Sequence, residues 1–143
     1  MNRSLILFRI LLVIIGSFII YVGINVGFGG IPTLGFQVNS DFLTVTNEAD
    51  FRIQDNHVRF LGGLFGTLGA FMVFAATHPT KYQQALRLTF VMMFIGGITR
   101  LAAPEPQVAI SPAILTSFIT EVVVMPIMFF WLPRLSDASD STQ

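Results

Sequence analysis

Four stretches of the sequence are apolar over about 20 residues each, and short polar segments separate them. A helix needs about 20 mostly apolar residues to cross the roughly 30 Å of hydrocarbon in a bilayer. The pattern therefore predicts an all-α, polytopic membrane protein with four transmembrane helices in a compact antiparallel bundle. We place the spans at about residues 5–26, 57–77, 82–103 and 112–132, within one transmembrane domain over 1–135.

Prolines mark most of the predicted span ends. His78-Pro79-Thr80 predicts a tight turn between the second and third spans, because proline cannot continue a helix. The sequence APEP at 103–106 predicts a second, stiff turn. Ser111-Pro112 is typical of a helix start, with a capping residue and a proline in the first position. We expect the fourth span to stop at Pro133 and the polar tail over 136–143 to be disordered.

The first span begins with Arg3 and Arg9 and could be mistaken for a signal peptide. Its apolar stretch is too long for a signal peptide, and no small-x-small cleavage site follows it. We therefore expect an uncleaved membrane anchor.

The segment over residues 28–56 is the only sizeable part predicted outside the membrane. Within it, FQVNSDFLTV contains two short β-prone pieces around Asn39-Ser40-Asp41, which predicts a small β-hairpin. NEADFRIQDN then predicts a helical segment that leads into the second span. A surface cap over the bundle is the simplest role for this outer loop.

The composition supports a membrane protein and excludes several kinds of functional site. Charged residues make up 11% of the chain, against about 25% in soluble proteins, and 53% of the residues are hydrophobic. The absence of cysteine excludes disulfides, thiol catalysis and cysteine-based metal sites. The net charge is zero and there is no basic patch, so we expect no nucleic-acid partner.

Lysine and arginine residues predict the orientation. If the N-terminus is cytoplasmic, that side carries five of them and the other side three. The three are Arg52, Arg59 and Arg100, and they lie among the acidic residues Asp41, Glu48, Asp50, Asp55 and Glu105. We therefore expect both termini in the cytoplasm and the loop over 28–56 outside it.

Small residues recur along the spans at spacings that place them on one helix face. Helices in lipid associate where small residues let their backbones approach closely, so these faces should point inward. Homodimerisation would use such faces equally well, but their recurrence in three spans favours a bundle within one chain. The expected helix-packing residues are Gly62, Gly63, Gly66, Gly96 and Gly97, with Gly16, Gly23 and Gly27 in the first span.

One carboxylate, Glu121, lies near the middle of the fourth span. A charge at that depth costs about 2.5 to 3.5 kcal/mol on insertion scales, so it should be paired or protonated. Helical side chains lean toward the N-terminus of their own helix. Glu121 and Arg100 therefore lean toward each other, and Arg59 is expected to complete a buried ion cluster.

Three interpretations of this cluster remain open: an ion pair that fixes the helix register, a binding or ion-handling site, and a catalytic carboxylate. Catalysis is the weakest, because Glu121 has no second acid, nucleophile or metal-ligand set near it in the sequence. His57 and His78 lie on opposite sides of the membrane and cannot share a metal. We expect no enzyme activity, no catalytic residues, no metal and no cofactor. Pro126 predicts a kink beside the charge.

The sequence also resembles a known family. The segment NHVRFLGGLFGTLGAF, the segment GGITRL and the acidic residue in the fourth span are similar to small bacterial membrane proteins catalogued as domain of unknown function 4345. The resemblance covers the chain from the first span to about Leu132. It implies a four-helix protein of the bacterial inner membrane, with no known activity or cofactor, and it places Arg59, Arg100 and Glu121 at the polar positions expected in that family.

Two functions follow from these observations. The first is a non-enzymatic accessory or scaffold bundle held together by the Arg-Glu cluster. The alternative is a small transporter or ligand-binding membrane protein that uses the cluster of Arg59, Arg100 and Glu121. The expected partners are the lipid bilayer and either other membrane subunits or further copies of the chain.

Overall fold

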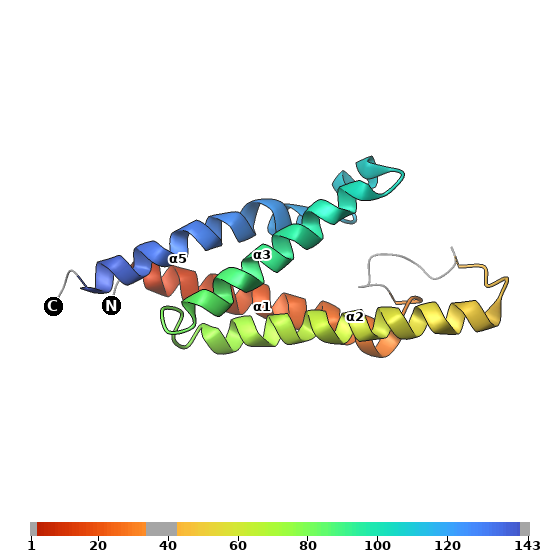
Figure 1. Cartoon of the computed structure of the whole chain (residues 1–143), viewed down its shortest axis with the longest axis horizontal. Coiled ribbons are helices and arrows are strands. Elements are labelled where there is room, and N and C mark those ends of the chain that lie inside the picture. The colour runs from red at the N-terminus through yellow and green to blue at the C-terminus, as the bar shows by residue number, and fades with distance from the viewer. Residues whose placement is uncertain (1–2, 34–42, 141–143) are drawn as a thin grey trace. The chain divides into compact units, whose positions relative to one another are not determined.

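The computed structural model describes the backbone of residues 3–33 and 43–140 and the side chains as far as Leu135. Within these residues the chain is all-α and contains no strand (Figure 1). The long helices are α1 (Arg3–Gly29), α2 (Glu48–Ala75), α3 (Gln83–Thr99) and α5 (Met125–Asp140). The short elements are η3 (Arg100–Ala102), η4 (Pro106–Ile110), α4 (Leu115–Ile119) and η5 (Thr120–Val124), and η5 is a π-helical turn.

The described residues contain four helical segments that are long and apolar enough to cross a membrane. They cover Arg3–Gly29, Glu48–Ala75, Gln83–Ala102 and Leu115–Leu135. Many large apolar side chains on these segments are exposed, among them Phe60 at 64% and Phe130 at 66%. Such surfaces suit hydrocarbon as the surrounding medium. The prediction of an all-α chain with four membrane-spanning helices is confirmed at this level.

The second helix begins well before the predicted span. Asn47 caps it, since Asn47 Oδ1 accepts the N–H groups of Ala49 at 3.1 Å and Asp50 at 3.3 Å. The helical lead-in predicted from NEADFRIQDN is thus part of α2. The predicted turn after α2 is also present, with the N–H of His78 bonded to the Ala75 carbonyl at 3.1 Å.

The fourth span begins later than its predicted start at residue 112. The N–H groups of Ile114 and Leu115 bond to the Ser111 carbonyl, at 3.0 and 2.8 Å, and close a turn there. Ser111 thus contributes its backbone oxygen, and α4 starts at Leu115 without a side-chain cap. The helix start predicted at Ser111-Pro112 is wrong by about one turn, because these residues form a tight turn of their own.

The predicted stop at Pro133 is wrong, because α5 continues through it to Asp140. Proline removes only one backbone bond, the one to the carbonyl four residues earlier, and membrane helices tolerate such a loss. Leu132 and Leu135 are buried on either side of it and hold the helix in place. Residues 136–140 of the tail predicted to be disordered are therefore helical, while 141–143 lie outside the described residues. Most of the predicted hairpin, over 34–42, also lies outside them.

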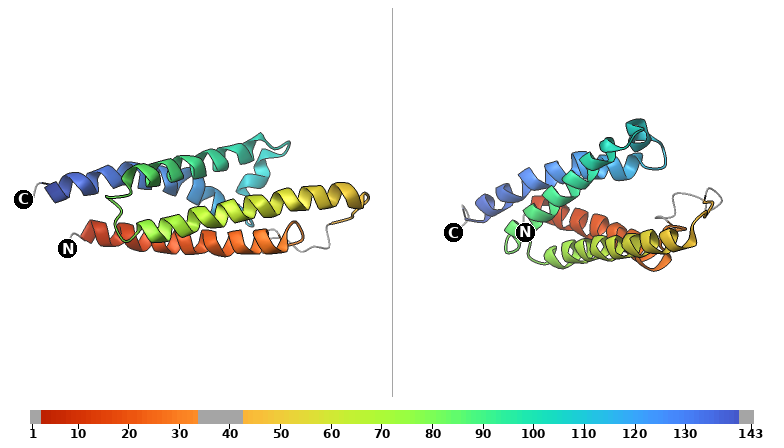
Figure 2. Two further views of the ribbon diagram at one scale, coloured as in Figure 1. Left: turned by 60° about the horizontal axis from the view of Figure 1, so that its bottom comes forward. Right: turned by 45° about the vertical axis from the view of Figure 1, so that its right-hand side comes forward.

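The chain forms two compact units, of which one comprises residues 11–74. In this α1–α2 unit the two helices run antiparallel and lie side by side in both views of Figure 2. Glycines line their contact: Gly16 faces Gly69, Gly23 faces Gly66, and Gly27 faces Gly62. A Cβ added to Gly69 would lie 2.6 Å from the Gly16 carbonyl oxygen, too close for a real contact. The absence of a side chain at Gly62 and Gly69 lets the two backbones approach this closely, whereas a Cβ on Gly66 would make ordinary contacts at 3.5 Å.

Gly63 lies off this contact, although its neighbour Gly62 is part of it. A Cβ added to Gly63 would meet nothing within 4 Å, whereas one added to Gly62 would overlap the backbone nitrogen of Gly27. Gly63 was predicted to share the packing stripe, and its packing role stays a prediction.

The other unit comprises residues 1–10 and 75–143 and contains α3, η5, α5 and the first residues of α1. Its core includes Phe8, whose ring packs edge-on against Phe90 and Trp131, with centroids 6.5 and 5.5 Å apart. Trp131 Nε1 donates to Ser4 Oγ at 2.9 Å. The start of α1 and the second half of α5 therefore lie together at one end of this unit.

Adjacent glycines in α2 provide a test of the α1–α2 contact. We expect Gly62→Ala to lower the free energy of unfolding by about 1 to 3 kcal/mol, because the new methyl group overlaps the α1 backbone. Gly63→Ala is the matched control and should be neutral or stabilising, since alanine is the better helix former. Thermal melting of both variants in the same detergent measures the difference. Equal effects would show that this contact does not depend on glycine at position 62.

Candidate functional site

Glu121 and Arg100 form an ion pair within the unit that contains α3 and α5. Arg100 Nε lies 2.7 Å from Glu121 Oε2, and Arg100 Nη2 lies 2.7 Å from Glu121 Oε1. The guanidinium thus meets the carboxylate side-on through two parallel bonds, the arrangement in which arginine binds carboxylates best. The Glu121 side chain is only 7% exposed and that of Arg100 38% exposed, so the acid is the buried member.

Gly97 makes room for this pair. It lies three residues before Arg100, on the same face of α3, and a Cβ added there would come 2.7 Å from the Cβ of Glu121. The acidic side chain therefore crosses α3 where α3 has no side chain of its own. Gly96 lies off this contact, since an added Cβ would meet nothing within 4 Å. Of the two glycines predicted to pack, Gly97 carries the contact inside this unit, and the role of Gly96 stays a prediction.

Glu121 is part of the π-helical turn η5, which ends just before Pro126. The N–H of Met125 bonds to the Thr120 carbonyl, five residues back, instead of the usual four. Pro126 has no N–H to offer the carbonyl of Val122, so the ordinary bonding pattern fails there in any case. The widened turn absorbs this defect and directs Glu121 at α3. The sequence predicted a distortion at Pro126, and the structure shows a π turn around the acid.

The geometry limits what Glu121 can do chemically. Both of its oxygens accept bonds from one guanidinium, and the pair has no net charge. A carboxylate held in this way has fewer lone pairs left for a metal or a substrate. The exposed side of Arg100 is the part of the pair best able to meet another group. Among the described residues, no cluster of three His, Asp or Glu side chains could hold a metal ion.

Arg59 has different partners, all inside the α1–α2 unit. Its Nε lies 2.6 Å from Asp55 Oδ2, and its other nitrogens donate to the carbonyls of Phe28 and Gly29, the latter at 3.2 Å. Asp55 Oδ1 accepts the N–H of Ile31 at 2.8 Å. Asp55 and Arg59, one turn apart on α2, together hold the C-terminal end of α1. We call these two residues the α1 clamp.

The α1 clamp acts where a helix has unpaired carbonyls and a partial negative charge. Gly30 ends α1 with a φ of 72°, a conformation that glycine adopts readily, and its N–H bonds to the Val26 carbonyl at 2.9 Å. Thr33 Oγ1 donates to the carbonyls of Asn25 and Gly30, at 3.1 and 3.0 Å. The end of α1 is therefore satisfied by backbone and side-chain partners together.

The structure thus brings together two of the three residues predicted for the ion cluster. Arg100 and Glu121 meet as the sequence indicated, whereas Arg59 pairs with Asp55. Sequence reasoning missed Asp55, which was counted only as an acid of the outer loop. Its spacing of four residues before Arg59 on a predicted helix was the available signal, because such residues are neighbours on one face.

A second arginine on α2 allows a controlled test of the α1 clamp. Arg59→Ala removes bonds to a carboxylate and to two carbonyls, so we expect the free energy of unfolding to fall by about 2 to 3 kcal/mol. Arg52→Ala is the control: Arg52 also pairs with an acid one turn earlier, Glu48, but the two side chains are 78% and 76% exposed. Its loss should cost about 0.5 kcal/mol or less. Chemical unfolding in detergent micelles compares the two, and equal losses would rule out the clamp.

Comparison with known proteins gives one result. No curated protein and no solved structure matches the chain. A family model does match, and the matched residues include Asp55, Arg59, Arg100 and Glu121. Since the match spans residues 7–132 of 143, the chain belongs to the family described as Domain of unknown function (DUF4345).

Proposed function

We propose that the protein is a non-enzymatic accessory or scaffold protein of the bacterial inner membrane, with its four spans in a compact antiparallel bundle. The observation that carries this proposal is the saturated ion pair, in which Arg100 occupies both oxygens of Glu121. A structural pair needs a closed arrangement of this kind. A transport or ligand site needs a polar group left open to its ligand, and in this pair the buried acid has none, so only the exposed part of Arg100 remains.

Fixing the helix register is the role that suits such a pair. Buried ion pairs add little net stability, but a mismatched register leaves a charge without a partner at a large cost. Arg100 follows α3, while Glu121 belongs to the turn that leads into α5. The pair therefore allows one alignment of the third and fourth spans and penalises alignments shifted by a turn. A scaffold for other subunits benefits from one fixed shape.

A small transporter or ligand-binding protein is the second candidate, and the π turn favours it. Single π turns inside membrane helices often lie at functional sites, where they provide a place for local rearrangement. Here the turn carries Glu121, a buried acid within the span Leu115–Leu135, and its partner Arg100 is partly exposed. A rearrangement of η5 that released Glu121 from Arg100 would create a charged site inside the fourth span.

The partners that fit either function are the lipid bilayer and further membrane subunits or copies of this chain. The exposed phenylalanines and leucines of the spans supply the lipid-facing surface. In the proposed orientation both termini are cytoplasmic. The bond between Ser4 and Trp131 supports part of this, because it places the start of α1 beside the end of the fourth span.

A double-mutant cycle tests the ion pair. We expect Glu121→Gln to lower the free energy of unfolding by roughly 2 to 3 kcal/mol, somewhat less than for a fully buried pair because Arg100 is partly exposed. Arg100→Met on the glutamine background should recover part of that loss. The measurement is thermal or chemical unfolding of the parent, the two single variants and the double variant in one detergent. A coupling near zero would refute the structural role and favour the transport or binding candidate.

Reporter fusions test the proposed orientation independently. A reporter placed after Gln143 should be active only as a cytoplasmic fusion, and one inserted within residues 38–50 only as an extracytoplasmic fusion. The basis is the excess of lysine and arginine on the side of the termini. A cytoplasmic result for the inserted reporter would overturn the four-span topology proposed here.

A further inference from the structure

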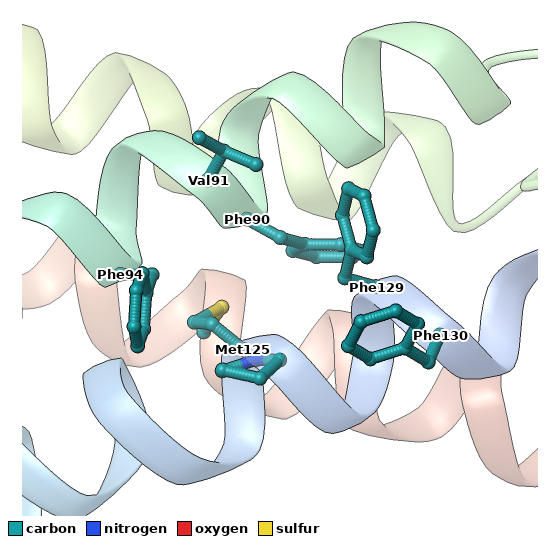
Figure 3. A pocket seen from close by; sticks show the side chains of 7 residues that line it. Phe90, Val91, Phe94, Met125, Phe129 and Phe130 are labelled. Carbon is teal, nitrogen blue, oxygen red and sulfur yellow. The ribbon is translucent and has the colours of Figure 1, made fainter.

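An apolar groove lies between α3 and α5, on the unit that carries the ion pair (Figure 3). Its volume is about 230 Å³, and its lining is almost entirely hydrocarbon. Phe94 and Met125 lie at one end, and Phe129 and Phe130 at the other. Pro126, which cannot donate a backbone bond, also lines it. Nothing in this lining could recognise a polar molecule along the length of the groove.

A cation lies at the Phe129 end of the groove. Arg87 is one helical turn before Val91, a groove residue, and its guanidinium carbon lies 4.3 Å from the centre of the Phe129 ring. Its Nε is buried and has no hydrogen-bond partner among the described residues. Arg134 is exposed and lies one turn after Phe130 on α5, toward the same end. The groove is therefore apolar along its length and positively charged at one end.

We propose that this groove binds an anionic phospholipid, with an acyl chain between α3 and α5 and the headgroup phosphate on Arg87. Arginine holds phosphate through paired N–H donors. Arg87 as a residue is half-buried and has no ion-pair partner among the described residues, so the accessible part of its guanidinium can meet a phosphate. Basic sites beside membrane helices recognise anionic headgroups in this way. Arg134 adds a second positive charge near the headgroup.

Charge complementarity selects this occupant over the others. An apolar helix of a partner subunit would fill the groove but would leave the positive charge of Arg87 without a counter-charge, which is costly in hydrocarbon. A free anion would satisfy Arg87 but would leave the groove unused. A phospholipid has an anionic headgroup at one end and hydrocarbon chains at the other. The headgroup can meet Arg87 while an acyl chain fills the apolar groove. With the proposed orientation the headgroup lies in the cytoplasmic leaflet, but binding itself does not depend on that orientation or on a scaffold role.

Two lipids with identical acyl chains test the headgroup contact. The purified full chain in detergent is titrated with dioleoyl phosphatidylglycerol and with dioleoyl phosphatidylcholine, and bound lipid is counted by native mass spectrometry. We expect the parent to bind phosphatidylglycerol about fivefold more tightly or better, the effect of one arginine near an anionic headgroup. Arg87→Gln should abolish most of this preference, while Arg87→Lys should retain part of it. Lys81→Gln is the control and should keep the preference, because Lys81 is also cationic but lies over the ring of Tyr82, which does not line the groove, whereas Arg87 lies over Phe129, which does.

A groove-filling variant tests the acyl-chain contact. Val91→Trp places a large side chain in the groove and should weaken binding of both lipids several-fold while leaving the melting temperature in lipid-free detergent unchanged. Should it unfold the chain, Phe130→Ala replaces it, because widening the groove should also weaken binding of both lipids. The proposal is overturned by equal affinity of the parent for the two lipids, or by a preference that survives Arg87→Gln. Lipid binding that is unchanged when the groove is altered would overturn it as well, as would inorganic phosphate binding as tightly as the lipid.

Discussion

In the hydrocarbon of a bilayer there is no water to bond a charged or polar group, so each such group in a span must find a partner inside the protein. This constraint accounts for the main polar features of the chain. Glu121 has both oxygens on Arg100, and the end of α1 has its carbonyls on Arg59. Pro126 lacks a donor, and the π turn before it rearranges the backbone bonds around that loss. Glu121 and Pro126 lie on the fourth span and Arg59 on the second. In each case the protein itself bonds a polar group that lipid could not.

The same constraint explains why glycine occurs where it does. A polar contact between helices needs short distances, and a backbone approaches most closely where a side chain is missing. Gly97 lets Glu121 cross α3, and the glycine pairs between α1 and α2 bring the end of α1 within reach of Arg59. The glycines and the charged residues therefore act together. The glycines set the distance between the helices, and the ion pairs fix their register.

Much of this arrangement was predictable from the sequence. The number and type of helices followed from apolar length, and the pairing of Arg100 with Glu121 followed from depth and side-chain direction. The predictions that failed concern the ends of individual helices and the partners of individual residues. The predicted starts and stops at Ser111 and Pro133 rested on residue preferences, and the tertiary contacts of Leu132 and Leu135 override such preferences. Gly62 and Gly63 could not be told apart, because a change of 100° in helix phase decides which of two adjacent glycines faces α1. Asp55 was missed as a partner of Arg59, because depth was weighed more heavily than the acid one turn away.

The arginines of the spans differ in what the chain itself provides for them. Arg59 and Arg100 each have a carboxylate and are satisfied within their units, so their charges serve the fold. Arg87 has an aromatic ring below it and a buried Nε with no acceptor among the described residues, although it lies next to a groove without polar groups. A paired charge in a membrane protein is explained by the partner it has. For Arg87 the proposed partner comes from outside the chain, and the apolar groove beside it favours a molecule that is anionic at one end and hydrocarbon at the other.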